Sequence, residues 1–350
     1  MVIVNARSFP RAGFLGNPSD GYYGKTLSFA FADYCVDLKL VESEVMRFLP
    51  GEVDDATFES PARLVRDIRL YGYYGGIRML KAVSKLFFEY CFDHGIALPE
   101  RNFTAEYRTN IPRLVGLSGS SAICSAMLKA LCKFYDVEIP LDYAPTICLE
   151  AEKFELGINC GFQDRVIQMY GGVVFMDFRR DYVEANNKGL YEPLDPKLLP
   201  NVYVAFDPNR AEESGKAHKT VKRLFDQKQS DIMSAMSEFA DIAQRGRDAL
   251  VAGKVEAIPA LVNANFDLRD RIFNVSPENR RMVMTARSAG ASAKFAGSGG
   301  AIVGTFEDEA HFRRLQEALL TIGCTTFVPQ IGTRDLEAAD LKNAGTWRKS

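Results

Sequence analysis

Apolar and polar residues alternate along the chain with two different periods, which predict both strands and helices. Segments 27–43, 103–111 and 171–178 are rich in aromatic and apolar residues with partial alternation, which is typical of strands. We interpret 27–43 as a pair of strands. Apolar residues at helical spacing predict one helix over 77–95 and another over 122–134.

A proline-rich, polar segment over 191–201 is the best candidate for a domain boundary. Before it, residues 150–156 are expected to be helical. After it, the expected elements are, in order, a strand at 202–206, a mostly helical stretch over 211–289, a glycine-rich turn and strand at 293–306, a helix, and a strand near 324–329. Residues 334–350 read as a polar tail. We therefore predict an α+β protein with two domains, 1–195 and 196–350.

Composition and charge narrow the possible functions. The 350 residues are 47% hydrophobic and 25% charged, with a formal net charge of -2, so a sizeable core is expected but no electrostatic footprint for nucleic acid or an anionic membrane. The seven scattered cysteines and three distant histidines have no metal-ligand spacing, which disfavours a zinc site. No signal peptide or membrane span is evident, so we expect a soluble, cytoplasmic protein.

The first sign of chemistry is the sequence GLSGSSA at 116–122, which precedes the predicted helix. Glycines and serines at a helix start let several backbone N–H groups converge on an anion, and either Ser120 or Ser121 has a hydroxyl within reach of a bound metal. The same stretch is also an ordinary helix start, with a serine as its N-cap. Neither common nucleotide-binding pattern is present.

Three other compact stretches accompany this loop: RAGFLGNPSDGYYG from Arg11, GFQDR at 161–165 and GSGG at 297–300. Taken alone, the first is typical of a surface turn, the second of a structural ion pair and the third of a tight turn between elements. Their joint occurrence suggests a shared cleft.

In order along the chain, RAGFLGNPSD, IPRLVGLSGSSA and KFAGSGGA resemble the three motifs of the GHMP small-molecule kinases. Within that superfamily, GFLGNPSDGYYGKT and GFQDRVIQMYGG most resemble the glucuronokinases, and the likeness runs from Arg11 to beyond Val303. The resemblance implies an N-terminal domain similar to domain 2 of ribosomal protein S5, a ferredoxin-like C-terminal domain, and a nucleotide cleft between them.

The resemblance also implies ATP and Mg²⁺ as cofactors, and it assigns residues to each. The loop expected to wrap the ATP phosphates is Gly116, Leu117, Ser118, Gly119, Ser120 and Ser121. The loop expected to close over them is Gly297, Ser298, Gly299 and Gly300. Ser121 and Glu152 are the expected Mg²⁺ ligands. The alternative for Glu152 is a solvated carboxylate on a helix, and Glu150 and Glu155 lie close by.

The expected catalytic residues are Asp164 and Arg11. Asp164 would accept the proton of the attacking hydroxyl or orient that hydroxyl electrostatically, and Arg11 would keep Asp164 ionised. Asp20 and Asn17 are expected, with Asp164, to bind the substrate. Galactokinases have Glu-His where this chain has Asn17 and Pro18, which disfavours galactose.

These features predict an ATP- and Mg²⁺-dependent sugar 1-kinase that converts glucuronate to glucuronate 1-phosphate. A kinase for galacturonate, fucose or arabinose, or a non-catalytic sensor of sugar or nucleotide, remains an alternative. No partner beyond the small-molecule substrate is predicted, and the oligomeric state is left open. A uronate carboxylate is expected to pair with a cation, and the candidates are Arg108, Arg113, Arg179, Arg180 and Arg210. Lys25 is a possible further cation. Possible sugar contacts are Tyr22, Tyr23, Tyr73 and Tyr74.

Overall fold

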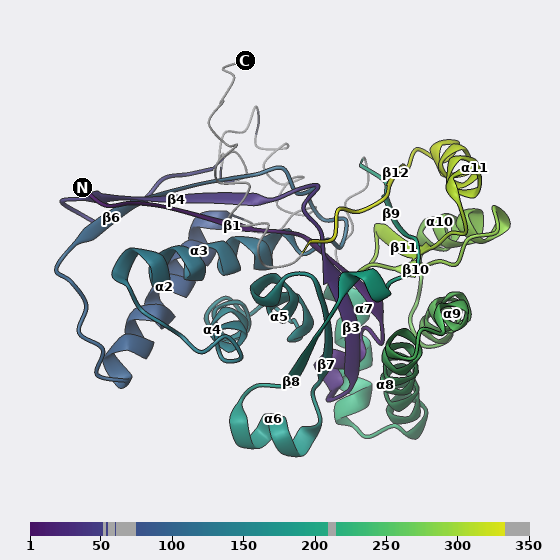
Figure 1. The fold of residues 1–350 in the computed structure, drawn as a ribbon. Helices are drawn as coiled ribbons and strands as arrows, with labels where there is room; N and C mark the ends of the chain where they lie inside the picture. The colour runs from purple at the N-terminus through teal and green to yellow at the C-terminus, as the bar shows by residue number, and fades with distance from the viewer. Residues whose placement is uncertain (52–53, 55–59, 61–74, 209–214, 333–350) are drawn as a thin grey trace.

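The computed structural model describes residues 1–51, 54, 60, 75–208 and 215–332, which form three four-stranded sheets with helices packed around them (Figure 1). The predicted polar tail 334–350 lies outside the described residues, as do Tyr73, Tyr74 and Arg210.

The first sheet has the order β1-β4-β6-β5. Its strands are β1 (Ile3–Ser8), β4 (Val36–Ser43), β5 (Arg47–Phe48) and β6 (Asn102–Thr109). Helices α2 (Gly76–Asp93) and α3 (Gly119–Tyr135) lie against this sheet (Figure 1). Both predicted helices are confirmed, and α3 begins within the glycine-serine loop.

The second sheet has the order β2-β3-β7-β8 and is antiparallel throughout. Its strands are β2 (Arg11–Leu15), β3 (Lys25–Ala30), β7 (Val173–Asp177) and β8 (Leu190–Leu194). The expected strand pair over 27–43 is wrong as a pair, because β3 and β4 belong to different sheets. Taken alone, the stretch from Arg11 is typical of a surface turn, but residues 11–15 form a strand that is buried along its whole length.

The helices beside these sheets carry the rest of the first half. They are α4 (Ala144–Glu150), a π-helical turn (Ala151–Glu155), α5 (Gln163–Tyr170) and α6 (Arg180–Asn186). Residues 150–156 are therefore helical as predicted, but they continue a helix that starts earlier. The π-helical turn places Glu152 in a fully buried position, and such turns occur frequently at functional sites.

The third sheet has the order β10-β11-β9-β12 and is also antiparallel. Its strands are β9 (Val202–Phe206), β10 (Lys294–Phe295), β11 (Ala301–Thr305) and β12 (Thr325–Phe327). The helices of this half are α7 (Gly215–Asp226), α8 (Ser230–Val251), α9 (Ile258–Ile272), α10 (Pro277–Ser288) and α11 (Glu309–Leu320). Pro259 and Pro277 lie in the first turns of α9 and α10, where a missing N–H costs no helical hydrogen bond.

One hydrophobic core extends through both halves of the chain. Helix α8 packs closely against β2, because a Cβ at Gly246 would lie 2.1 Å from Cδ1 of Leu15. The boundary near residue 195 therefore stays a prediction. Among the described helices, none has the length and apolar character needed to cross a membrane.

Candidate active site

A cavity of about 620 Å³ opens between the two halves of the chain. All four stretches singled out in the sequence contribute to its wall, although they lie far apart along the chain. The lining includes Arg11, Asn17, Asp20, the loop 116–121, residues 160–165, Gly297 and Ser298. The predicted shared cleft is thus present.

The loop 116–121 presents the start of α3 to this cavity. Gly116 and Ser118 have φ angles of 75° and 68°, and the second is unusual for a residue with a side chain. The helix then begins at Gly119, so the first N–H groups of α3 and the positive end of its dipole face the cavity. Ser118 occupies the N-cap position without a side-chain cap, so neither Ser120 nor Ser121 caps this helix.

The two glycine-rich loops lie backbone against backbone. A Cβ at Gly297 would lie 2.2 Å from the Gly116 carbonyl oxygen, and a Cβ at Gly116 would lie 2.4 Å from the Gly299 carbonyl oxygen. No side chain fits at either position unless the loops separate. The glycines therefore allow the two loops to form one continuous wall.

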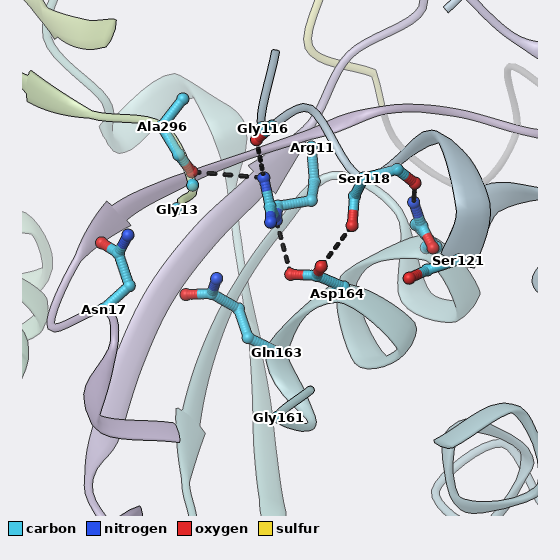
Figure 2. Close-up of polar contacts among 12 residues, drawn as sticks. Arg11, Gly13, Asn17, Gly116, Ser118, Ser121, Gly161, Gln163, Asp164 and Ala296 are labelled. Atoms are coloured by element: carbon cyan, nitrogen blue, oxygen red, sulfur yellow. Dashed lines mark hydrogen bonds and ion pairs between the residues drawn. The ribbon is translucent and has the colours of Figure 1, made fainter. Parts of the chain in front are cut away.

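Arg11 joins these loops to Asp164 (Figure 2). Its Nε donates to Oδ1 of Asp164 at 2.6 Å, and its Nη1 donates to the carbonyls of Gly116 at 2.7 Å and Ala296 at 3.2 Å. The Arg11 side chain is only 6% exposed, whereas that of Asp164 is 20% exposed. Arg11 is thus a buried support, and Asp164 keeps an accessible face.

The surroundings of Asp164 keep it ionised. Burial by itself raises the pKa of this carboxyl, but the guanidinium groups of Arg11 and Arg165 and the hydrogen bonds from Arg11 and Ser118 hold its pKa well below the ordinary value. The Ser118 hydroxyl donates to Oδ2, so the loop 116–121 and the carboxylate contact each other directly.

Asp20 has the opposite electrostatic character. Burial and the nearby charge of Asp164 raise the pKa of Asp20 to about 6, despite a hydrogen bond from the Gln163 backbone N–H at 3.1 Å. A Cβ at Gly161 would lie 2.0 Å from Oδ2 of Asp20, so only glycine permits this approach. The cavity therefore holds two carboxyl groups whose pKa values are displaced in opposite directions.

A third carboxylate, that of Glu152, is completely buried beneath the start of α3. Its Oε1 accepts hydrogen bonds from the Ser120 and Ser121 hydroxyls, each at 3.2 Å. Its Oε2 accepts from Nε of Arg165 at 2.6 Å, in an ion pair that excludes solvent. The two serine hydroxyl oxygens and Oε1 of Glu152 form a compact group at the cavity wall.

Comparison with known proteins identifies the family. The models of the GHMP kinases N terminal domain and of the GHMP kinases C terminal match residues 78–172 and 247–323. The chain is 45% identical to "Probable glucuronokinase 2" of Arabidopsis thaliana over 308 residues, which is 86% of this chain and 84% of that protein. It belongs to the GHMP kinases.

A second relative supports this membership over the full length. "Glucuronokinase 1" of Arabidopsis thaliana is 40% identical over 347 residues, covering 97% of this kinase and 95% of the relative. The structure of Lactococcus lactis galactokinase complexed with galactose has a TM-score of 0.70 at 15% identity, covering 95% of this chain and 94% of that one. The predicted two-domain GHMP kinase fold is confirmed, and the chain is a phosphotransferase with an alcohol acceptor.

The predicted Mg²⁺ ligands of this kinase have suitable chemistry. Ser121 and Glu152 place oxygens at the cavity wall, and oxygens are the hard ligands that Mg²⁺ prefers. Within the described residues, no cluster of three or more His, Cys, Asp or Glu side chains is placed to bind a metal. A Mg²⁺ ion held by Ser121 and Glu152 would take its remaining ligands from phosphate and water.

Asn17 lies at the cavity wall, where the buried amine of Lys294 holds its side chain. Asn17 is only 3% exposed, and its Oδ1 accepts a hydrogen bond from the Lys294 amine. That amine also donates to the carbonyls of Gly13 at 2.6 Å and Phe295 at 2.8 Å. Burial, together with the charges of Arg269 and Arg11, lowers the pKa of Lys294 well below its usual range.

Sequence reasoning did not anticipate the roles of Lys294 and Arg269, and it considered Arg165 only as a partner of Asp164 in an ion pair. Arg269 donates to the carbonyls of Gly297 at 2.9 Å and Ser298 at 2.9 Å, which supports the third motif from behind. Of the described arginines expected near a uronate, Arg113 lines the cavity, whereas Arg108, Arg179 and Arg180 do not. The possible sugar contacts Tyr22 and Tyr23 also line it. The possible further cation Lys25 does not.

Proposed function

We propose that this GHMP kinase is an ATP- and Mg²⁺-dependent sugar 1-kinase that phosphorylates the anomeric hydroxyl of D-glucuronate. The observation that carries the proposal is the contact between Asp164 and the loop 116–121, because an ionised carboxylate lies beside a helix start of the kind that suits a phosphate. The names of the two relatives supply the substrate.

Asp164 acts on the acceptor hydroxyl chiefly as an orienting charge. A carboxylate whose pKa lies far below the ordinary value holds a proton weakly, so it is a poor general base. Phosphoryl transfer through a loose transition state depends more on positioning than on strong proton abstraction. Asp164 therefore accepts a hydrogen bond from the hydroxyl and aims its oxygen at the terminal phosphate.

Backbone N–H groups and a Mg²⁺ ion would hold the phosphates of ATP. The N–H groups at the start of α3 bind the triphosphate, and Ser121 with Glu152 would hold Mg²⁺, which neutralises phosphate charge when bound. Arg165 fixes Oε2 of Glu152 and leaves Oε1 directed at the serines. Arg11 keeps Asp164 in place and ionised, so it acts through that carboxylate.

The acceptor side is lined by Asp20, Tyr22, Tyr23 and Phe178. Asp20 accepts hydrogen bonds from sugar hydroxyls when ionised. The uronate carboxylate pairs with a basic side chain of the cavity wall, where Arg113, Lys222 and Arg269 are placed.

The test is ADP release with Mg²⁺ and ATP across glucuronate, galacturonate, glucose, fucose and arabinose. Turnover on glucuronate, at least about 100-fold above the neutral sugars, is expected because a desolvated carboxylate partner discriminates strongly. Asp164→Ala is the background control. Equal turnover on a neutral sugar, or ADP release that Asp164→Ala does not abolish, would reject the assignment.

A further inference from the structure

Gln163 carries a buried hydrogen-bond acceptor that the chain leaves unused. It is the first residue of α5 and is only 3% exposed. Within the described part of the chain, its side-chain oxygen Oε1 has no hydrogen-bond partner. The residue also lines the cavity. A buried acceptor without a donor is unfavourable, so a ligand that supplies one is expected.

The side chain is held in one place by its neighbours. A Cβ at Gly13 would lie 3.0 Å from both Nε2 of Gln163 and Cγ of Asn17, so the amide fills the space that the glycine leaves. Figure 2 shows the Gln163 side chain between Asn17 and Asp164. Its own backbone N–H donates to Asp20. The Gln163 side chain is thus held beside Asp164, the residue that the proposed function assigns to the reacting hydroxyl.

The chemistry around Oε1 of Gln163 determines which hydrogen-bond donor can pair with it. An amide oxygen and the carboxylate of Asp20 both accept hydrogen bonds, so together they suit hydroxyl groups and repel a carboxylate or a phosphate. ATP and the uronate carboxylate are thereby excluded as partners of Oε1. A polyol ring with adjacent hydroxyls matches both acceptors.

We propose that Gln163 is a specificity-determining residue whose Oε1 accepts a hydrogen bond from one ring hydroxyl of the sugar. This inference rests on the proposed sugar-kinase function and adds a sugar contact that the kinase motifs do not contain. It also separates two roles within one turn of α5, since Asp164 addresses the reacting hydroxyl and Gln163 a neighbouring one.

The experiment compares wild type with Gln163→Met on glucuronate and on its 2-deoxy, 3-deoxy and 4-deoxy analogues. Met preserves the length of the side chain and removes the acceptor. We expect KM for glucuronate to rise about 10-fold, with kcat and the KM for ATP within about threefold of wild type. For one deoxy analogue, the one that lacks the bonded hydroxyl, wild type should already show a KM about 10-fold above its KM for glucuronate. Gln163→Met should not raise the KM for that analogue further.

The matched control is Gln244→Met, a half-buried glutamine on α8 outside the cavity wall, which should leave all constants unchanged. Thermal unfolding of each variant checks that it is folded, and Gln163→Asn, which withdraws the acceptor by one methylene, is the second variant if Met disrupts folding. Equal losses on every deoxy analogue, or a KM for glucuronate within twofold of wild type, would overturn the role of Gln163. A wild-type enzyme that turns over no sugar would overturn the proposed function itself.

Discussion

Replacing Asp20 with Asn should remove one pH-dependent contribution to stability and to catalysis. Because burial and Asp164 raise the pKa of Asp20 to about 6, the folded protein binds its proton more tightly than the unfolded chain does. The protonated form therefore stabilises the fold at low pH, and this contribution is lost as pH rises through about 6. Asn keeps an oxygen for the Gln163 N–H but does not titrate.

The size of the effect follows from the two pKa values. With an unfolded-state pKa near 3.8 and a folded-state pKa of about 6, wild type gains about 1.4 kcal/mol of unfolding free energy relative to Asp20→Asn between pH 8 and pH 5. Asp164 contributes nothing to this difference, because it remains ionised across that range in both states. Urea unfolding of the ligand-free protein at the two pH values measures the change.

The pH dependence of catalysis should also depend on Asp20. If the ionised form of Asp20 binds the sugar, kcat/KM for the sugar falls about 10-fold from pH 8 to pH 5 in wild type, and that limb is absent in Asp20→Asn. The titration of ATP itself is common to both proteins. Asp241→Asn, at an exposed position on α8, is the control and should follow wild type. Parallel profiles for wild type and Asp20→Asn would refute this account of Asp20.

Three further substitutions test the other parts of the site. Asp164→Asn should lower kcat by about 10³-fold while ATP binding, measured by calorimetry, persists; near-normal turnover would remove Asp164 from the reaction. Ser121→Ala should raise the Mg²⁺ concentration for half-maximal activity about 10-fold, and an unchanged requirement would argue against this ligand. Gly297→Ala places a Cβ 2.2 Å from the Gly116 carbonyl oxygen, so the loops must part and kcat/KM should fall about 100-fold; wild-type kinetics would show that the loop contact is dispensable.

Local patterns predicted most of the helices and the main strands well. Segments such as 122–134 have a single strong period and need no knowledge of their partners. Strand pairing was less accessible, because alternation in 27–43 indicates strands but does not say which strand lies beside which. The strand at 11–15 was missed since its neighbours are glycines, a proline and polar residues, which are typical of turns.

In the candidate site, too, local sequence patterns predicted some features and not others. Its loops were evident because glycine and serine at 116–121 and 297–300 have a direct physical meaning at a phosphate. The supporting contacts were not, since Lys294 reaches Asn17 across 277 positions of sequence and no local pattern records that approach. The same is true of Gln163, whose side-chain oxygen is buried without a partner only in the folded structure.

The most direct test of the account is a crystal structure of this kinase with glucuronate and a non-hydrolysable ATP analogue. The terminal phosphate should contact the backbone N–H groups at the start of α3, and the anomeric oxygen should lie about 3 Å from the Asp164 carboxylate, in line with that phosphate. A triphosphate seated away from residues 116–121, or a sugar that turns another hydroxyl towards Asp164, would contradict it.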